Sequence, residues 1–65
     1  MISQKDIYLS AQVLIKQHGD KAEEFASQKM EAMMKRDDAK GAGVWLAITS
    51  AIDDLRTVKT QEKLH

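Results

Sequence analysis

The 65-residue chain contains no cysteine and no proline, and it has only three glycines. Without cysteine, neither a disulfide nor a thiolate metal site can add to its stability. Proline and glycine are the residues that helix interiors tolerate least, so their scarcity favours helix. Aromatic residues are also few: one tryptophan, one tyrosine and one phenylalanine. Because a chain this short buries only about 60% of the surface that its unfolded form exposes, we expect a single domain with a small core.

The sequence also lacks an excess of either charge, since ten basic and ten acidic side chains give a formal net charge of zero. Proteins that bind nucleic acid usually carry a basic excess or a basic face, so nucleic acid is not the expected partner. Near-zero charge leaves little repulsion between copies. The chain has no apolar stretch long enough to span a membrane and no basic-then-apolar leader. We therefore expect a cytoplasmic protein with no membrane partner.

Capping residues and a glycine predict a first helix over residues 4–18. Ser3 is a favoured N-cap residue, and Asp6 three positions later completes a variant of the capping box. Gly19 supplies the C′ position at which many helices end. Between them, apolar residues recur at the spacing of one helical face, namely Ile7, Ala11, Leu14 and Ile15.

A second helix is predicted over residues 21–36. Asp20 and Glu23 have the spacing of another capping box. The residues expected to face inward are Ala22, Phe25, Ala26, Met30 and Met33. Only one or two residues link this helix to the first, so we expect a sharp corner at Gly19.

A third helix is predicted over residues 38–59, followed by a frayed tail over residues 60–65. Its apolar pattern comprises Val44, Ile48, Ala51, Ile52, Leu55 and Val58. Three amphipathic helices in this order predict an all-α fold, a small three-helix domain over residues 1–65 that could form a dimer.

The start of the third helix has two interpretations. Asp37 and Asp38 compete as its N-cap, and Gly41 and Gly43 weaken its first turns. Residues 37–43 could therefore form a loop. We favour a start near Asp38, with Gly41 allowing a neighbouring helix to approach closely.

Two stretches, DIYLSAQVLIKQHGDKA and DDAKGAGVWLAITSAIDDL, together resemble a family of short uncharacterised helical proteins of alphaproteobacteria. In that family an aliphatic helix ends in His-Gly-Asp, and a Gly-x-x-Val-Trp segment opens a third helix. The matching positions here are His18, Gly19, Asp20, Gly41, Val44 and Trp45. The chain differs at Leu46 and Ala47, where polar or basic side chains are expected. The resemblance implies a small helical fold and a bacterial origin. It implies no activity, because the family has none established.

His18 is the only histidine inside the chain and the first candidate for acid–base or metal chemistry. Asp20, Glu23 and Glu24 are near enough in sequence to complete a metal site. We favour a simpler role, in which the imidazole bonds free carbonyls at the end of the first helix. We predict no metal and no cofactor.

The adjacent acidic pairs are not catalytic dyads, because neighbouring residues on a helix point about 100° apart. We interpret Asp37 and Asp38 as capping residues, and Asp53 and Asp54 as part of a solvated face.

The most informative feature is a second apolar stripe. By the 100° helical step, Ile2, Leu9 and Val13 lie opposite the inward residues of the first helix, and Leu46 lies opposite those of the third. Scattered surface apolar residues are normal, but a helix that is apolar on both sides is usually covered on both sides. We favour an interface, with surface scatter as the alternative.

Two further side chains are possible additions to that interface. Met34 is expected to turn outward from the second helix, and Trp45 is expected at the core edge. The candidate contact residues are Leu9, Val13, Leu46, Met34 and Trp45.

These features predict a protein–protein interaction module, an adaptor, accessory subunit or inhibitor that binds a second copy or a larger protein. The alternative is a nucleic-acid-associated regulator whose Arg56, Lys59 and Lys63 contact phosphates, although Asp53 and Asp54 on the same helix weigh against it. An enzyme is not expected, because no nucleophile–base pair, phosphate loop or metal signature is present.

Overall fold

The structure, a computed structural model, describes residues 3–63, with side chains described for residues 3–57. This part of the chain contains no strand, so the all-α class is confirmed. Its helical residues form two runs along the chain, and the first run consists of two α-helices joined by a 3₁₀ turn. The elements are α1 (Gln4–His18), the turn η1 (Gly19–Lys21), α2 (Ala22–Lys35) and α3 (Ala39–Lys63). The predicted three-helix arrangement is confirmed only in part, because the 3₁₀ turn η1 joins α1 to α2 with no loop between them.

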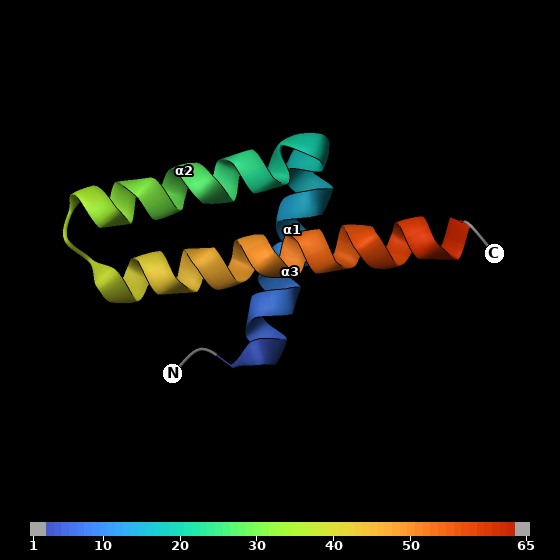
Figure 1. The fold of residues 1–65 in the computed structure, drawn as a ribbon, viewed down its shortest axis with the longest axis horizontal. Helices are drawn as coiled ribbons and strands as arrows, with labels where there is room; N and C mark the ends of the chain where they lie inside the picture. The colour runs from blue at the N-terminus through green and yellow to red at the C-terminus, as the bar shows by residue number, and fades with distance from the viewer. Residues whose placement is uncertain (1–2, 64–65) are drawn as a thin grey trace.

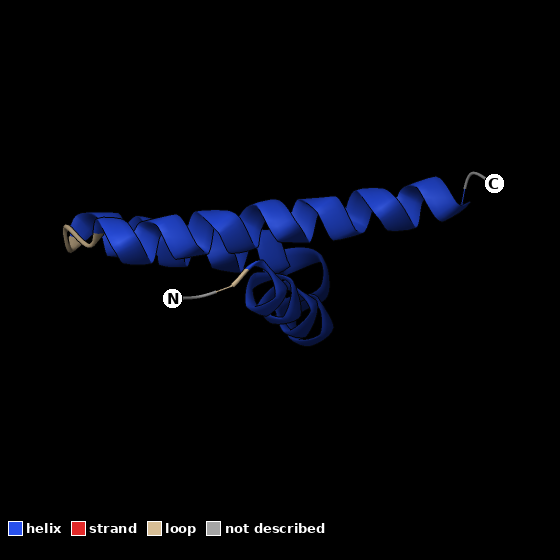
Figure 2. Ribbon diagram, turned by 90° about the horizontal axis from the view of Figure 1, so that it is seen from below, coloured by secondary structure: helices blue, strands red, loops and turns tan. Residues whose placement is uncertain are grey.

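The elements form two layers. Helices α2 and α3 run antiparallel and side by side, and α1 crosses them on one side (Figure 1). Seen from below, α1 is viewed nearly end-on, beneath the layer that α2 and α3 form (Figure 2). The molecule measures 44 × 23 × 16 Å and has a radius of gyration of 12.4 Å. A compact domain of this length would have a radius of gyration of about 11 Å, so the fold is elongated along α3.

Helix α1 begins at the predicted cap, Ser3, but only part of the predicted corner between α1 and α2 is observed. Ser3 Oγ accepts a hydrogen bond from the Asp6 N–H at 3.2 Å. At the other end Gly19 has φ 57° and ψ −125°, and its N–H bonds the carbonyl of Ile15. The predicted cap at Asp20 is wrong: Asp20 lies within η1, and neither η1 nor α2 has a side-chain cap. Helix α2 needs no side-chain cap, because the carbonyls of the 3₁₀ turn accept hydrogen bonds from N–H groups at its start. For example, the Ala22 N–H donates to the Gly19 carbonyl.

The connection between α2 and α3 is only three residues long. Asp37 has φ 60°, in the left-handed region. The Asp37 N–H bonds the Met34 carbonyl at 3.0 Å and the Asp38 N–H bonds the Met33 carbonyl at 2.8 Å, which together make a Schellman motif. Asp38 Oδ1 then accepts from the Gly41 N–H at 2.9 Å and caps α3. Asp38 is therefore the N-cap, and a loop over residues 37–43 is excluded.

Helix α3 begins where the favoured interpretation placed it and ends later than predicted. A Cβ on Gly41 would lie 2.7 Å from Asp38 Oδ2 and 3.0 Å from the sulfur of Met33, so the glycine leaves room for the capping carboxylate and for a side chain of α2. The backbone stays helical to Lys63, four residues beyond the predicted end at residue 59. Residues 60–63 contain no glycine or proline to stop it, and extending an existing helix costs little.

The core is small and rich in alanine. Its buried members are Ala11, Leu14, Ala22, Ala26, Ile48, Ala51 and Ile52. The larger apolar side chains pack around it and are only partly buried: Ile7, Tyr8, Ile15, Phe25, Val44, Trp45 and Leu55. Ile52 is the largest side chain that is fully buried. The alanines let three helices meet closely, but they add little buried apolar area.

Candidate interaction surface

Leu9 and Val13 lie on the surface of α1 that faces away from the rest of the molecule. Their side chains are 49% and 51% exposed. Both are two residues from the fully buried Ala11, so each points about 160° away from it around the helix axis. Because α1 forms a layer of its own, no described element covers this side (Figure 2). Ile2, predicted to extend the stripe, lies outside the described residues.

Leu46 is exposed on a different helix from Leu9 and Val13. It is 55% exposed on α3, two residues before the buried Ile48, and so points away from the core. Helices α1 and α3 lie on either side of that core, so their outward faces point in different directions. Helical periodicity identifies the outward side of each helix but not how the helices are placed, so the role of these three residues as contact residues stays a prediction.

Met34 and Trp45 occupy different environments. Met34 is 63% exposed in the last turn of α2. Trp45 is partly buried against the core, and its ring lies edge-on to Phe25 with 6.2 Å between centroids. The placement of Trp45 at the core edge is confirmed.

His18 stacks on Phe25 and does not bond helix-end carbonyls. The ring centroids are 4.3 Å apart and the planes differ by 18°. Lys29 Nζ lies 5.4 Å from the centroid of the same phenylalanine ring. A shallow depression of about 250 Å³ is lined here by His18, Lys21, Glu24, Phe25 and Gln28. Within the described residues no three histidine, aspartate or glutamate side chains are grouped so that they could hold a metal ion.

Tyr8 and Asp54 join α1 to α3. The tyrosine hydroxyl donates a hydrogen bond of 2.9 Å to Asp54 Oδ2. This hydrogen bond, the charge of the carboxylate and desolvation raise the pKa of Tyr8, against an opposing hydrogen bond from Gln4. Asp54 is exposed, as expected of a solvated face, but it also accepts a hydrogen bond that joins two helices, a role that was not predicted from the sequence. The two residues are 46 positions apart, and no local pattern relates them.

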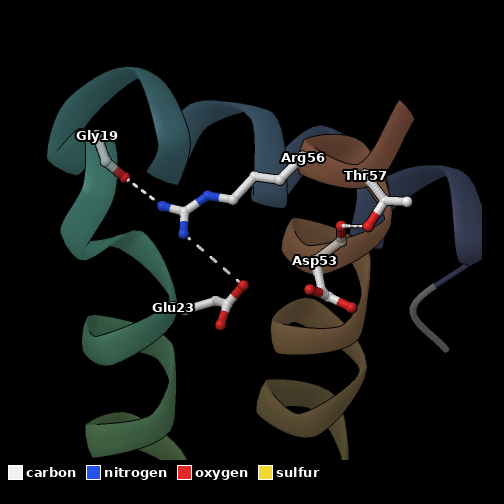
Figure 3. A network of polar contacts seen from close by, with 5 residues as sticks. All are labelled: Gly19, Glu23, Asp53, Arg56 and Thr57. Atoms are coloured by element: carbon white, nitrogen blue, oxygen red, sulfur yellow. Dashed lines mark hydrogen bonds and ion pairs between the residues drawn. The ribbon is translucent and has the colours of Figure 1, made fainter. Parts of the chain in front are cut away.

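Arg56 bridges α3 to the corner between α1 and α2 (Figure 3). One guanidinium nitrogen donates to the Gly19 carbonyl at 2.7 Å, and the other lies 3.8 Å from Glu23 Oε1. Arg56 is one of the three residues that the nucleic-acid alternative assigned to phosphates, and here its guanidinium contacts Gly19 and Glu23. The side chains of Lys59 and Lys63, the other two cations of that alternative, lie outside the described part.

Comparison with known proteins finds no matching family model, curated protein or solved structure. None of the helices in the described range 3–63 is both long enough and apolar enough to cross a membrane.

Proposed function

We propose that this protein is a small protein–protein interaction module of the cytoplasm, which binds through the outward side of α1. The observation that supports this proposal is the exposed pair Leu9 and Val13, on a helix whose opposite side is already buried. Completing the burial of each half-exposed side chain would contribute about 1 kcal/mol, half or less of the value for a fully exposed residue. The role is binding rather than catalysis, with a second copy or a larger protein as partner.

The contacts of Tyr8, Arg56 and Phe25 hold the helices together without using the outward side of α1. Each has a contact that holds the fold together, to Asp54, to Gly19 and to Trp45 respectively. The outward side of α1 takes no part in these contacts. It can therefore be altered without disturbing the packing of the helices, which makes the proposal open to direct test.

The test replaces Leu9 and Val13 by lysine. The variant Leu9→Lys/Val13→Lys should keep its helicity by circular dichroism and lose the complexes that the parent protein forms, alone by sedimentation or in a host extract by crosslinking. The matched control Ser10→Lys/Gln12→Lys adds the same charge at exposed positions of the same helix, to either side of the apolar pair. It should keep the complexes. A parent protein that forms none, or a double variant that keeps them, would overturn the proposal.

A further inference from the structure

We infer that the partner of this surface is a second copy of the chain, bound antiparallel so that the two α1 helices face each other about a two-fold axis. The inference rests on the proposed function and adds the identity of the partner. We define the outer face of α1 as Asp6, Leu9, Val13 and Lys16. All four side chains are exposed.

The outer face is self-complementary in an antiparallel pair. Leu9 and Val13 lie at equal distances on either side of position 11, and so do Asp6 and Lys16. A two-fold axis at position 11 places Leu9 of one copy level with Val13 of the other. It also places each Asp6 carboxylate level with the Lys16 ammonium across the interface, twice by symmetry. A parallel pair would instead place like charges together.

The four residues are also clustered around the helix. With the 100° step, Leu9 and Val13 lie about 20° to either side of the centre line opposite Ala11, and Asp6 and Lys16 about 40° to either side. The apolar pair therefore forms the middle of the face and the charges form its border. This is the arrangement of an interface with an apolar centre and a polar rim.

Both charges are available for such a pairing. Among the described residues the ion pair found joins Arg56 and Glu23, so neither Asp6 nor Lys16 has a charged partner in that part of the chain. The zero net charge of the whole sequence means that copies do not repel one another. Because α1 is the outermost layer, two α1 helices can meet without moving α2 or α3 (Figure 2).

The contact is small. Two facing helices of 15 residues bury less than the roughly 1,200–2,000 Å² of a standard interface. We therefore expect dissociation in the micromolar range or weaker, and concentration-dependent sedimentation.

The test is a charge reversal made in trans. Asp6→Lys gives a chain with lysine at both positions, and Lys16→Asp gives a chain with aspartate at both. Each variant alone should be largely monomeric, because both cross-interface pairs become repulsive and the dissociation constant of the dimer rises about tenfold or more. An equimolar mixture should regain the parent affinity, since all pairs are then attractive. Circular dichroism checks that α1 remains helical in both variants. The control pair Glu31→Lys and Lys40→Asp makes the same charge changes at exposed positions of α2 and α3, and should leave dimerisation unchanged.

The outcomes separate this inference from the proposed function. A mixture that stays monomeric, or a parent protein that is monomeric at every concentration, overturns the antiparallel second copy. The interaction surface itself would still stand if Leu9→Lys/Val13→Lys abolished a complex with a larger protein. If that double variant changes nothing, the proposed function fails as well.

Discussion

Gly19 allows the chain to change direction between α1 and α2. Its φ of 57° lies in the region that side-chain-bearing residues rarely adopt, and a Cβ added there would meet no atom within 4 Å. The need for glycine is therefore one of backbone conformation and not of space. Gly43 has no such conformational need, since it lies inside α3 with an ordinary helical φ. A Cβ added there would also meet no atom within 4 Å.

Replacing these two glycines by alanine should change the free energy of unfolding in opposite directions. Gly19→Ala should lower the free energy of unfolding by about 1–2 kcal/mol, the cost of holding alanine at positive φ. Gly43→Ala should raise it by up to about 1 kcal/mol, because alanine is the better helix former. Urea unfolding followed by circular dichroism measures both. Equal effects at the two sites would contradict the conformation assigned to Gly19.

Tyr8 should make the stability of the folded protein depend on pH in the alkaline range. Its pKa is raised in the folded protein, chiefly by the hydrogen bond to Asp54, so the folded state favours the protonated hydroxyl. The stabilisation is complete below the unfolded pKa of about 10 and is lost as the pH rises through the higher folded pKa. Because Tyr8 is the only tyrosine, phenolate absorbance reports its titration alone. Asp54→Asn should lower the observed pKa, and Tyr8→Phe should flatten the stability curve above pH 10. An unchanged tyrosine titration in Asp54→Asn would refute the contact.

At the scale of the elements, the sequence predicts helices better than their arrangement. Ser3 and Gly19 bound α1 through local signals, and its predicted range of 4–18 agrees with the structure. The contacts of Tyr8 with Asp54 and of Arg56 with Gly19 join residues 46 and 37 positions apart. Helical periodicity cannot predict them, because it gives the direction of each side chain around its own helix and nothing about where another helix lies.

Replacing Arg56 should lower the stability of the fold more than replacing its ion-pair partner Glu23. Arg56→Met keeps much of the apolar stem and removes the 2.7 Å bond to the Gly19 carbonyl, so we expect a loss of about 1–2 kcal/mol. Glu23→Gln removes only a partly exposed pair at 3.8 Å and should cost less than about 0.5 kcal/mol. Thermal unfolding of the two variants compares them. A larger effect at Glu23 would show that the ion pair, and not the carbonyl bond, holds α3 to the corner.

At the scale of the whole molecule, a small core and an uncovered helix face occur together. Among the described residues, four of the seven buried side chains are alanine, so this core buries little apolar area, while Leu9 and Val13 remain half exposed on α1. Association through the outer face would bury these two side chains and add to the stability of each chain, as binding to the folded state always does. The molecule is thus suited to a role in which folding is reinforced by a partner.

Sedimentation equilibrium of the parent protein and of Leu9→Lys/Val13→Lys, each across a range of concentrations, tests this claim most directly. The account predicts that the parent mass rises with concentration from one chain towards two, and that the variant stays at one chain with unchanged helicity. A parent protein that sediments as one chain at every concentration would contradict self-association through α1, as would a variant that associates as the parent does.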